Sequence, residues 1–192
     1  MSIAVVILAA GEAKRFGSAK LVVPIGGVPL LRRAALAALA VSANVVIVTG
    51  AHREIVEACV ADLSVTCVFN VRWADGVGGS IARGVAQLAP TIGAAIILLA
   101  DQPLIGATEL RRLTDAYAAL PERIIAAQFS GVLGPPCLFP RAYFGELMLL
   151  QGDAGARVLL RQHADSVATV AMPAAAVDVD TPEDLSLFTS GA

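Results

Sequence analysis

Short apolar runs alternate with longer segments of helical composition along most of this chain, and this alternation limits the possible folds more than any other feature. The runs are predicted strands, rich in Val, Ile and Leu, at residues 3–9, 44–48, 65–69, 94–100 and 123–127. The predicted helices are residues 29–40, 53–61, 80–88 and 108–119. Strands that are apolar on both faces are typical of parallel sheets covered by helices, and right-handed crossovers place helices on both sides. The pattern predicts a Rossmann-like, three-layer α/β/α fold with a mostly parallel twisted sheet.

The composition indicates that residues 1–192 form a single domain. The chain is 57% hydrophobic and 16% charged, which argues against disorder, and its length suits one core. A formal net charge of −2 favours neither nucleic acid nor an anionic membrane as a partner. No apolar stretch reaches the ~18 to 20 residues of a membrane span, and no signal peptide is evident, so we expect a cytoplasmic protein. Cys59, Cys67 and Cys137 are widely spaced, as expected of reduced core thiols.

The loop after the first predicted strand has the composition of a phosphate-binding loop. Residues 8–20 read LAAGEAKRFGSAK and contain two glycines and the cations Lys14, Arg15 and Lys20. Backbone N–H groups of a glycine-containing turn can converge on an anion, while the cations neutralise its remaining charge. The loop has neither the Gly-Lys-Ser/Thr ending of a Walker loop nor a G-x-G-x-x-G pattern. It therefore predicts a nucleotide site of a third type, with a solvated polar loop as the plain alternative.

Two carboxylates stand where a metal ion would be expected. Ligands of open α/β sheets bind at the carboxyl ends of the strands, and Asp101 directly follows the fourth predicted strand. A carboxylate there needs a charged partner, and the next helix is expected too late, near Thr108, for Asp101 to cap it. Asp180 precedes a helix start at which Thr181 is the expected N-cap and Asp184 completes a capping box. Because Mg²⁺ takes one or two carboxylates together with phosphate oxygens, Asp101 and Asp180 are predicted metal ligands.

Three further segments combine small residues with charges. Residues 70–80 read NVRWADGVGGS, in which the glycines permit backbone contact with a base or ribose and Ser80 can cap the next helix. The alternative is a flexible turn with its tryptophan in the core. Residues 131–139 read GVLGPPCLF, and residues 151–157 read QGDAGAR. In the last segment Asp153 is the expected N-cap, so that Arg157 one turn along can meet a phosphate; the alternative leaves Arg157 in solvent.

Together these motifs resemble those of the molybdopterin nucleotidyltransferases, within the NTP transferase superfamily. The first loop of these proteins follows roughly L-A-A/G-G-x-x-x-R-x-G-x-x-K, and later segments follow N-x-x-W-x-x-G-x-x-x-S, G-x-x-G-H-P and G-D-x-G-A-R. The similarity extends from residue 6 to residue 185 and implies a nucleotide-diphospho-sugar transferase-like fold. One departure is Pro135, which stands where the family usually has His. Any ligand contact of that His is missing here.

The resemblance also implies roles for individual residues. Arg15, Lys20 and Asp101 are the implied catalytic residues, and Asp101 and Asp180 are the implied ligands of Mg²⁺. The implied nucleotide-binding residues are Leu8, Ala9, Ala10, Gly11, Arg15, Lys20, Asn70, Gly76, Gly79 and Ser80. The implied acceptor-binding residues are Gly134, Asp153 and Arg157.

Within this family, Leu-Ala-Ala-Gly in the first loop is associated with cytosine nucleotides and Leu-Ala-Gly-Gly with guanine. The methyl group of Ala10 leaves less room under a base, which favours CTP. The expected reaction transfers CMP from CTP to the terminal phosphate of molybdopterin and releases pyrophosphate, with transient contact to a molybdoenzyme or its chaperone. Alternatives are a guanylyltransferase or a sugar- or methylerythritol-phosphate cytidylyltransferase. A non-catalytic nucleotide-binding chaperone of cofactor delivery is a further alternative, to which Pro135 points.

Overall fold

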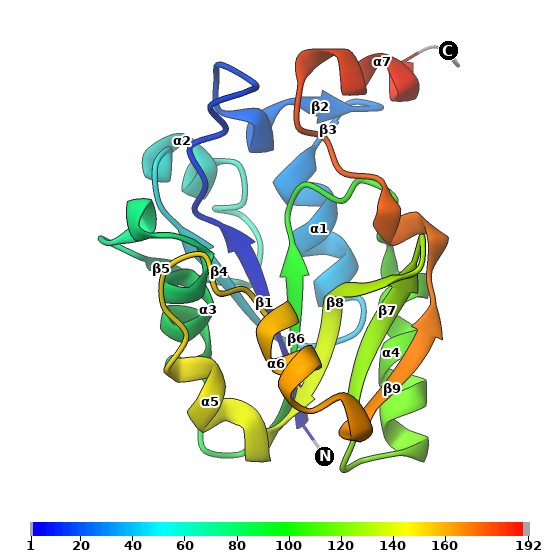
Figure 1. Cartoon of the computed structure of the whole chain (residues 1–192). Coiled ribbons are helices and arrows are strands. Elements are labelled where there is room, and N and C mark those ends of the chain that lie inside the picture. Colours follow the sequence, from blue (N-terminus) through cyan, green and yellow to red (C-terminus); the bar gives the residue numbers. More distant parts are fainter. Residues whose placement is uncertain (1, 190–192) are drawn as a thin grey trace.

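The computed structural model describes residues 2–189, and within this range seven strands form one central sheet (Figure 1). The strand order is β5 (Thr66–Phe69), β4 (Asn44–Thr49), β1 (Ser2–Ala9), β6 (Ile92–Leu99), β8 (Val132–Pro140), β7 (Ile124–Phe129) and β9 (Val167–Ala171). All neighbouring strands are parallel except β8, which runs antiparallel to both β6 and β7. The predicted Rossmann-like fold with a mostly parallel sheet is confirmed.

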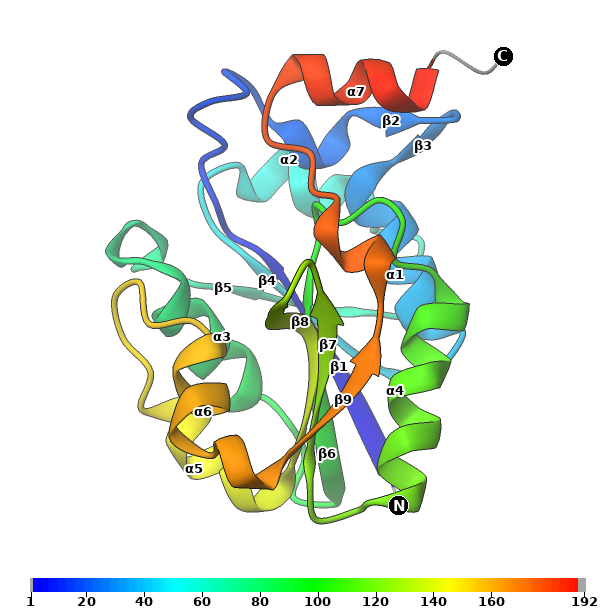
Figure 2. The same ribbon diagram turned by 45° about the vertical axis from the view of Figure 1, so that its right-hand side comes forward.

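Helices cover both faces of this sheet, as Figure 2 shows. The first face carries α1 (Leu30–Leu39), α2 (Arg53–Ala58) and α4 (Ala107–Ala119), whose apolar side chains share one core cluster. The second face carries α3 (Val77–Val85), α5 (Phe144–Met148) and α6 (Arg157–Gln162) around another. Alternate residues of β1 point into the two clusters, with Val5 and Ile7 in the first and Ala4 and Val6 in the second. Short 3₁₀ helices occur at Lys20–Val22, Trp73–Asp75, Arg141–Tyr143, Ala164–Ser166 and Pro173–Ala176.

A third, smaller cluster lies beyond the carboxyl ends of β1 and β6. It joins the hairpin of β2 (Pro24–Ile25) and β3 (Val28–Pro29) to α7 (Pro182–Thr189), and both views show α7 above this hairpin (Figure 1). Val179 is fully buried in the cluster, and its N–H donates to the carbonyl oxygen of Asp101 at 3.0 Å. This packing holds the segment before α7 beside the end of β6.

The structure differs from the sequence prediction mainly in the part of the sheet beyond β6 and in the small hairpin. β8, β9 and the small hairpin were not predicted. Pro135 and Pro136 lie within β8, where the pairing with β7 shifts between Ala126 and Ala127, and a proline in a strand is tolerated at such an irregularity because it has no N–H to donate. The cysteines are free thiols, as predicted. Within the described range, every helix is too short or too polar to cross a membrane.

Candidate active site

The candidate site lies where the order of the strands reverses. From β1 the chain adds β4 and β5 on one side, and β6 then pairs with the other side of β1, so that Leu8 and Leu99 are neighbours at the carboxyl ends. A ligand site is expected at such a switch point. A cavity of about 270 Å³ opens there, and the residues that line it include Leu8, Ala9, Gly11, Arg15, Lys20, Asp101 and Asp180. Six predicted nucleotide and catalytic positions thus share one cavity with the second predicted metal ligand.

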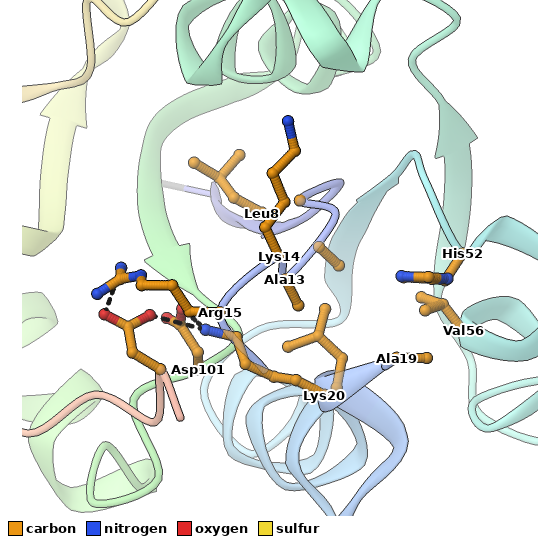
Figure 3. Close-up of a pocket in the computed structure, with 13 residues that line it drawn as sticks. Leu8, Ala13, Lys14, Arg15, Ala19, Lys20, His52, Val56 and Asp101 are labelled. Carbon is orange, nitrogen blue, oxygen red and sulfur yellow. Dashed lines mark hydrogen bonds and ion pairs between the residues drawn. The ribbon is translucent and has the colours of Figure 1, made fainter. Parts of the chain in front are cut away.

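The predicted catalytic and metal-binding side chains form one charge cluster (Figure 3). Lys20 Nζ lies 2.8 Å from Asp101 Oδ2 and 3.1 Å from Asp180 Oδ1, while Arg15 Nη2 lies 2.7 Å from Asp180 Oδ2. The Lys20 side chain is 10% exposed, whereas that of Arg15 is 72% exposed. Lys20 is therefore fixed between the carboxylates, and Arg15 reaches Asp180 from the solvent side.

Local structure explains why these distant residues meet. Lys20 begins a 3₁₀ helix and is buried with Leu21. Asp184 Oδ2 accepts the backbone N–H groups of both Asp180 and Thr181 at 2.8 Å, which fixes the segment before α7. These bonds hold the pKa of Asp184 below its usual value. The predicted capping interaction of Asp184 with Thr181 is therefore present, and it orients Asp180.

The carboxylate pair fits a divalent cation. Asp101 Oδ1 is buried without a hydrogen-bond partner, and Oδ2 is bonded to Lys20. Within residues 2–189, no three His, Cys, Asp or Glu side chains are grouped as a complete metal site. Two carboxylates suffice for Mg²⁺ when phosphate oxygens supply further ligands. Because the Lys20 ammonium lies between the same carboxylates, a metal ion and Lys20 must share or exchange these partners.

The first loop contains a strained turn in which some backbone N–H groups donate hydrogen bonds within the loop itself. Ala13 has φ of +54°, and its carbonyl oxygen accepts the N–H groups of Phe16 at 2.9 Å and Gly17 at 3.1 Å. Those two donors are therefore not available to a phosphate, contrary to the expectation for the loop as a whole. At Gly11 an added Cβ would meet no atom within 4 Å. The absence of a side chain at Gly11 leaves the cavity open to a ligand.

A second hollow of about 410 Å³ continues from the first past Gly11 and Asp101. It is lined by further predicted nucleotide-binding residues, Ala10, Gly76 and Ser80, and by the half-buried ring of Trp73. The sequence reasoning placed Trp73 only as a possible core residue. Its place in the glycine-rich segment 70–80 was the available signal for a ligand contact.

The structure does not bring Asn70 and Gly79 into these hollows. Both line a separate depression between α3 and the loop after α5. Asn70 is buried, and its Nδ2 donates to Ser80 Oγ at 3.0 Å, so Asn70 positions Ser80. The expectation that Ser80 caps a helix is wrong, because α3 begins at Val77 and Ser80 lies within its first turn.

Two of the sequence motifs pack against each other. Gly76 has φ of +117°, and a Cβ there would approach the Gly152 carbonyl carbon and oxygen to 2.3 Å. Gly78 N–H donates to the Gly152 carbonyl oxygen at 2.8 Å. Gly76 is thus required for contact between the loops, in addition to lining the second hollow. The predicted N-cap role of Asp153 is wrong, since α6 begins only at Arg157 and has Ala156 at its N-cap.

Two of the three predicted acceptor residues line a third hollow of about 450 Å³, and the third, Gly134, lies next to it. Asp153 and Arg157 line it, and the Arg157 Nε lies 3.0 Å from the position that a Cβ of the buried Gly134 would occupy. This hollow shares Leu8, Val77 and Leu99 with the second hollow, so the two are continuous. A molecule bound here could therefore reach Asp101 of the charge cluster through the second hollow, which Asp101 also lines.

Sequence reasoning missed three polar residues of these cavities. Arg161, one turn after Arg157, and Asp178 line the third hollow. Burial raises the pKa of Asp178, and the charges of Asp180 and Asp101 raise it further. His52 lines the first cavity, its Nε2 lying 3.1 Å from the Glu12 carbonyl oxygen. Two features of the sequence could have indicated these residues. They are the i, i+4 spacing of the two arginines and the position of His52 shortly after a predicted strand.

Comparison with known proteins gives consistent matches over most of the chain. A family described as MobA-like NTP transferase domain matches residues 5–167. The chain is 30% identical to the purine catabolism protein PucB of Bacillus subtilis, over 95% of this chain and 93% of PucB. It is 35% identical to the nicotine blue oxidoreductase of Paenarthrobacter nicotinovorans, over 82% of this chain and 80% of that protein.

Solved structures agree with this match. The crystal structure of Rv0371c from Mycobacterium tuberculosis H37Rv superposes with a TM-score of 0.84 at 27% identity, over 99% of this chain and 98% of that one. A complex of Rv0371c with manganese superposes with a TM-score of 0.79 at 26% identity, over 100% of both chains.

Proposed function

Because this chain belongs to the MobA-like NTP transferase domain family, it is a nucleotidyltransferase, and we propose that it transfers CMP from CTP to the terminal phosphate of molybdopterin. One observation carries the proposal. Lys20, Asp101 and Asp180 line the cavity formed by the phosphate-type loop, and the second hollow, which Asp101 also lines, continues from this cavity to the hollow lined by Arg157. This continuity supports binding of a triphosphate and an acceptor phosphate at two ends of one continuous site.

The proposed reaction requires positioning and charge neutralisation more than covalent help from the protein. An oxygen of the acceptor phosphate bonds to the α-phosphorus of CTP, the bond from that phosphorus to the bridging oxygen breaks, and pyrophosphate leaves with the electron pair. The acceptor oxygen is already anionic, so no general base is needed. Lys20 and Arg15 would stabilise the charge that develops on pyrophosphate, and Arg157 would orient the acceptor.

The same proposal includes a divalent cation, Mg²⁺, held by Asp101 and Asp180. When bound, the ion would neutralise phosphate charge. The orphaned Oδ1 of Asp101 and the manganese complex of Rv0371c support this assignment. Delivery of the product to a molybdoenzyme or its chaperone, in the cytoplasm and by transient contact, completes the proposal.

The preference for CTP is supported by Ala10. This residue is buried and lines the second hollow. Its backbone cannot move away from a bound base, because its carbonyl oxygen and Cα pack against Gly50. A methyl group held at this position favours the smaller pyrimidine base.

The test is release of pyrophosphate from each of the four nucleoside triphosphates, with and without molybdopterin, in the presence of Mg²⁺. The proposal predicts that CTP with molybdopterin gives the fastest release. Faster release from GTP would make the protein a guanylyltransferase. Release that requires a sugar phosphate or methylerythritol phosphate would change the acceptor, and binding of nucleotide without any release would favour a binding module.

A further inference from the structure

Two arginines of α6, one helical turn apart, face the third hollow. Arg157 and Arg161 both line it, and residues at i and i+4 are neighbours on one helix face. Within the part of the chain that the structure describes, neither guanidinium has a hydrogen bond or an ion pair. Two unpaired guanidinium groups on one wall of a cavity are typical of a site for an anionic ligand.

The other walls restrict what kind of anion fits. The surface beneath the arginines is apolar and includes Ile81, Ile97, Leu99 and Val158. Asp153 and Asp178 supply negative charge at other points of the hollow, which disfavours an anionic group placed away from the arginines. The volume of about 450 Å³ is much larger than a phosphate needs. The hollow therefore suits a molecule with an apolar or planar body and its negative charges on one side.

The two arginines are not equivalent. The Arg157 guanidinium lies against the backbone of Gly134, with its Nε and Nη2 at 3.0 and 3.1 Å from the position of an added Cβ. Arg161 is exposed like Arg157 and projects from the next turn, with Cβ atoms about 5 to 6 Å apart for this spacing. The two guanidinium groups can therefore meet two different parts of one ligand.

We infer that Arg161 is a specificity-determining residue that binds a second anionic group of the acceptor, one helical turn from the phosphate bound by Arg157. The acceptor class is then a phosphate monoester with an apolar or planar body and a further negative charge. This inference rests on the proposed function only in assigning the third hollow to the acceptor.

Two small probe molecules distinguish the two anion-binding positions in a binding measurement that requires no catalytic turnover. Phenyl phosphate carries one anionic group, and 4-carboxyphenyl phosphate carries a second across a planar ring. Isothermal titration of the full-length protein without nucleotide should show that the carboxylated probe binds about tenfold more tightly, as expected for one charge-assisted hydrogen bond. Arg161→Gln should remove this advantage and leave the affinity for phenyl phosphate unchanged. Arg157→Gln should weaken both probes.

Arg161→Lys, which keeps the charge, should retain part of the advantage. Arg123→Gln is the matched control, because Arg123 is exposed just before β7, outside the hollow, and it should bind both probes like the unmodified protein. Circular dichroism of each variant checks that the fold is retained.

Equal affinity of the unmodified protein for the two probes, or an equal loss for both in Arg161→Gln, would overturn the inference, and so would failure of both probes to bind. If the probes behave as expected but CTP releases no pyrophosphate, the proposed reaction fails while the anion site stands.

Discussion

The two sides of the candidate site differ in whether their positively charged side chains are paired with carboxylates. On the proposed nucleotide side, Lys20 and Arg15 are bound to Asp101 and Asp180 at 2.7 to 3.1 Å. On the proposed acceptor side, the guanidinium groups of α6 have no anionic partner within the described residues. The first set is ordered before any ligand binds, and the second set depends on its ligand for a partner.

Under the proposed function, this difference explains how one site would use both a metal ion and a triphosphate. A phosphate that attracts Lys20 also releases Asp101 and Asp180 for a metal ion, so nucleotide and metal should assist each other. The α6 arginines have no internal bond to break, and they should contribute directly to acceptor affinity.

Loss of Lys20 should produce the largest effect. Lys20→Ala is expected to lower CTP-dependent turnover by about 100-fold or more, as for one charge contact made in a transition state. It should also destabilise the protein by about 1 to 2 kcal/mol, a value reduced from that of a fully buried pair because the carboxylates are partly exposed. Steady-state kinetics and urea denaturation measure the two effects.

Lys14→Ala is the matched control for Lys20→Ala. Lys14 belongs to the same loop and also lines the first cavity, but its side chain points away from the Lys20 cluster (Figure 3), and it pairs with Glu12 at 3.3 Å at an exposed position. Its loss should reduce turnover far less and leave stability nearly unchanged. Equal effects of the two substitutions would contradict the special position of Lys20.

Asp101→Asn and Asp180→Asn should each raise the Mg²⁺ concentration needed for half-maximal activity by about tenfold or more. An amide supplies an oxygen ligand without negative charge. The rate is measured as a function of Mg²⁺ concentration at saturating CTP. If both variants keep the dependence of the unmodified protein, the carboxylate pair is not the metal site.

Ala10→Gly should change base preference and little else. The unmodified protein is expected to prefer CTP over GTP by about 10- to 200-fold in kcat/KM, which is the range for one methyl group in a pocket. Removal of the Ala10 methyl should reduce this ratio severalfold. Both nucleotides must be compared with one acceptor. A preference for GTP in the unmodified protein would refute cytidylyl transfer and leave nucleotidyl transfer intact.

The smallest effect is expected at an ion pair outside the site. Arg32 donates to Asp62 at 2.6 and 2.7 Å, and these bonds lower the pKa of Asp62 to about 2. Because the folded pKa is depressed, the stabilisation is present above the ordinary pKa of about 4 and is lost as the pH falls towards 2. Melting temperatures of the unmodified protein and Asp62→Asn should therefore differ at pH 7 and converge towards pH 2, with turnover at pH 7 unchanged. A difference that persists at low pH would contradict this assignment.

The sequence predicted five of the seven strands of the sheet and the members of the charge cluster, because both depend on local signals. Continuous apolar runs identified β1, β4, β5, β6 and β7, and strand-end positions identified Asp101. β8 was missed because two prolines interrupt its pattern, although they lie at a pairing irregularity.

Tertiary packing accounts for what the sequence could not predict in the site. The ion pairs of Lys20 with two carboxylates depend on Val179 and α7, which are more than 150 residues away in the chain. Gly76 was interpreted only as a ligand-contact residue, whereas its contact with Gly152 depends on how two loops pack. The same packing determines that Arg161 faces a cavity, which helix spacing alone does not specify.

The most direct test of the shared carboxylate pair is thermal unfolding with and without Mg²⁺ for the unmodified protein, Lys20→Ala and the double variant Lys20→Ala/Asp101→Asn. A ligand stabilises a protein according to its affinity for the folded state. If Lys20 and the metal ion share Asp101 and Asp180, Mg²⁺ should raise the melting temperature of Lys20→Ala more than that of the unmodified protein, and the double variant should lose this gain. An equal Mg²⁺ effect on all three proteins would contradict the account.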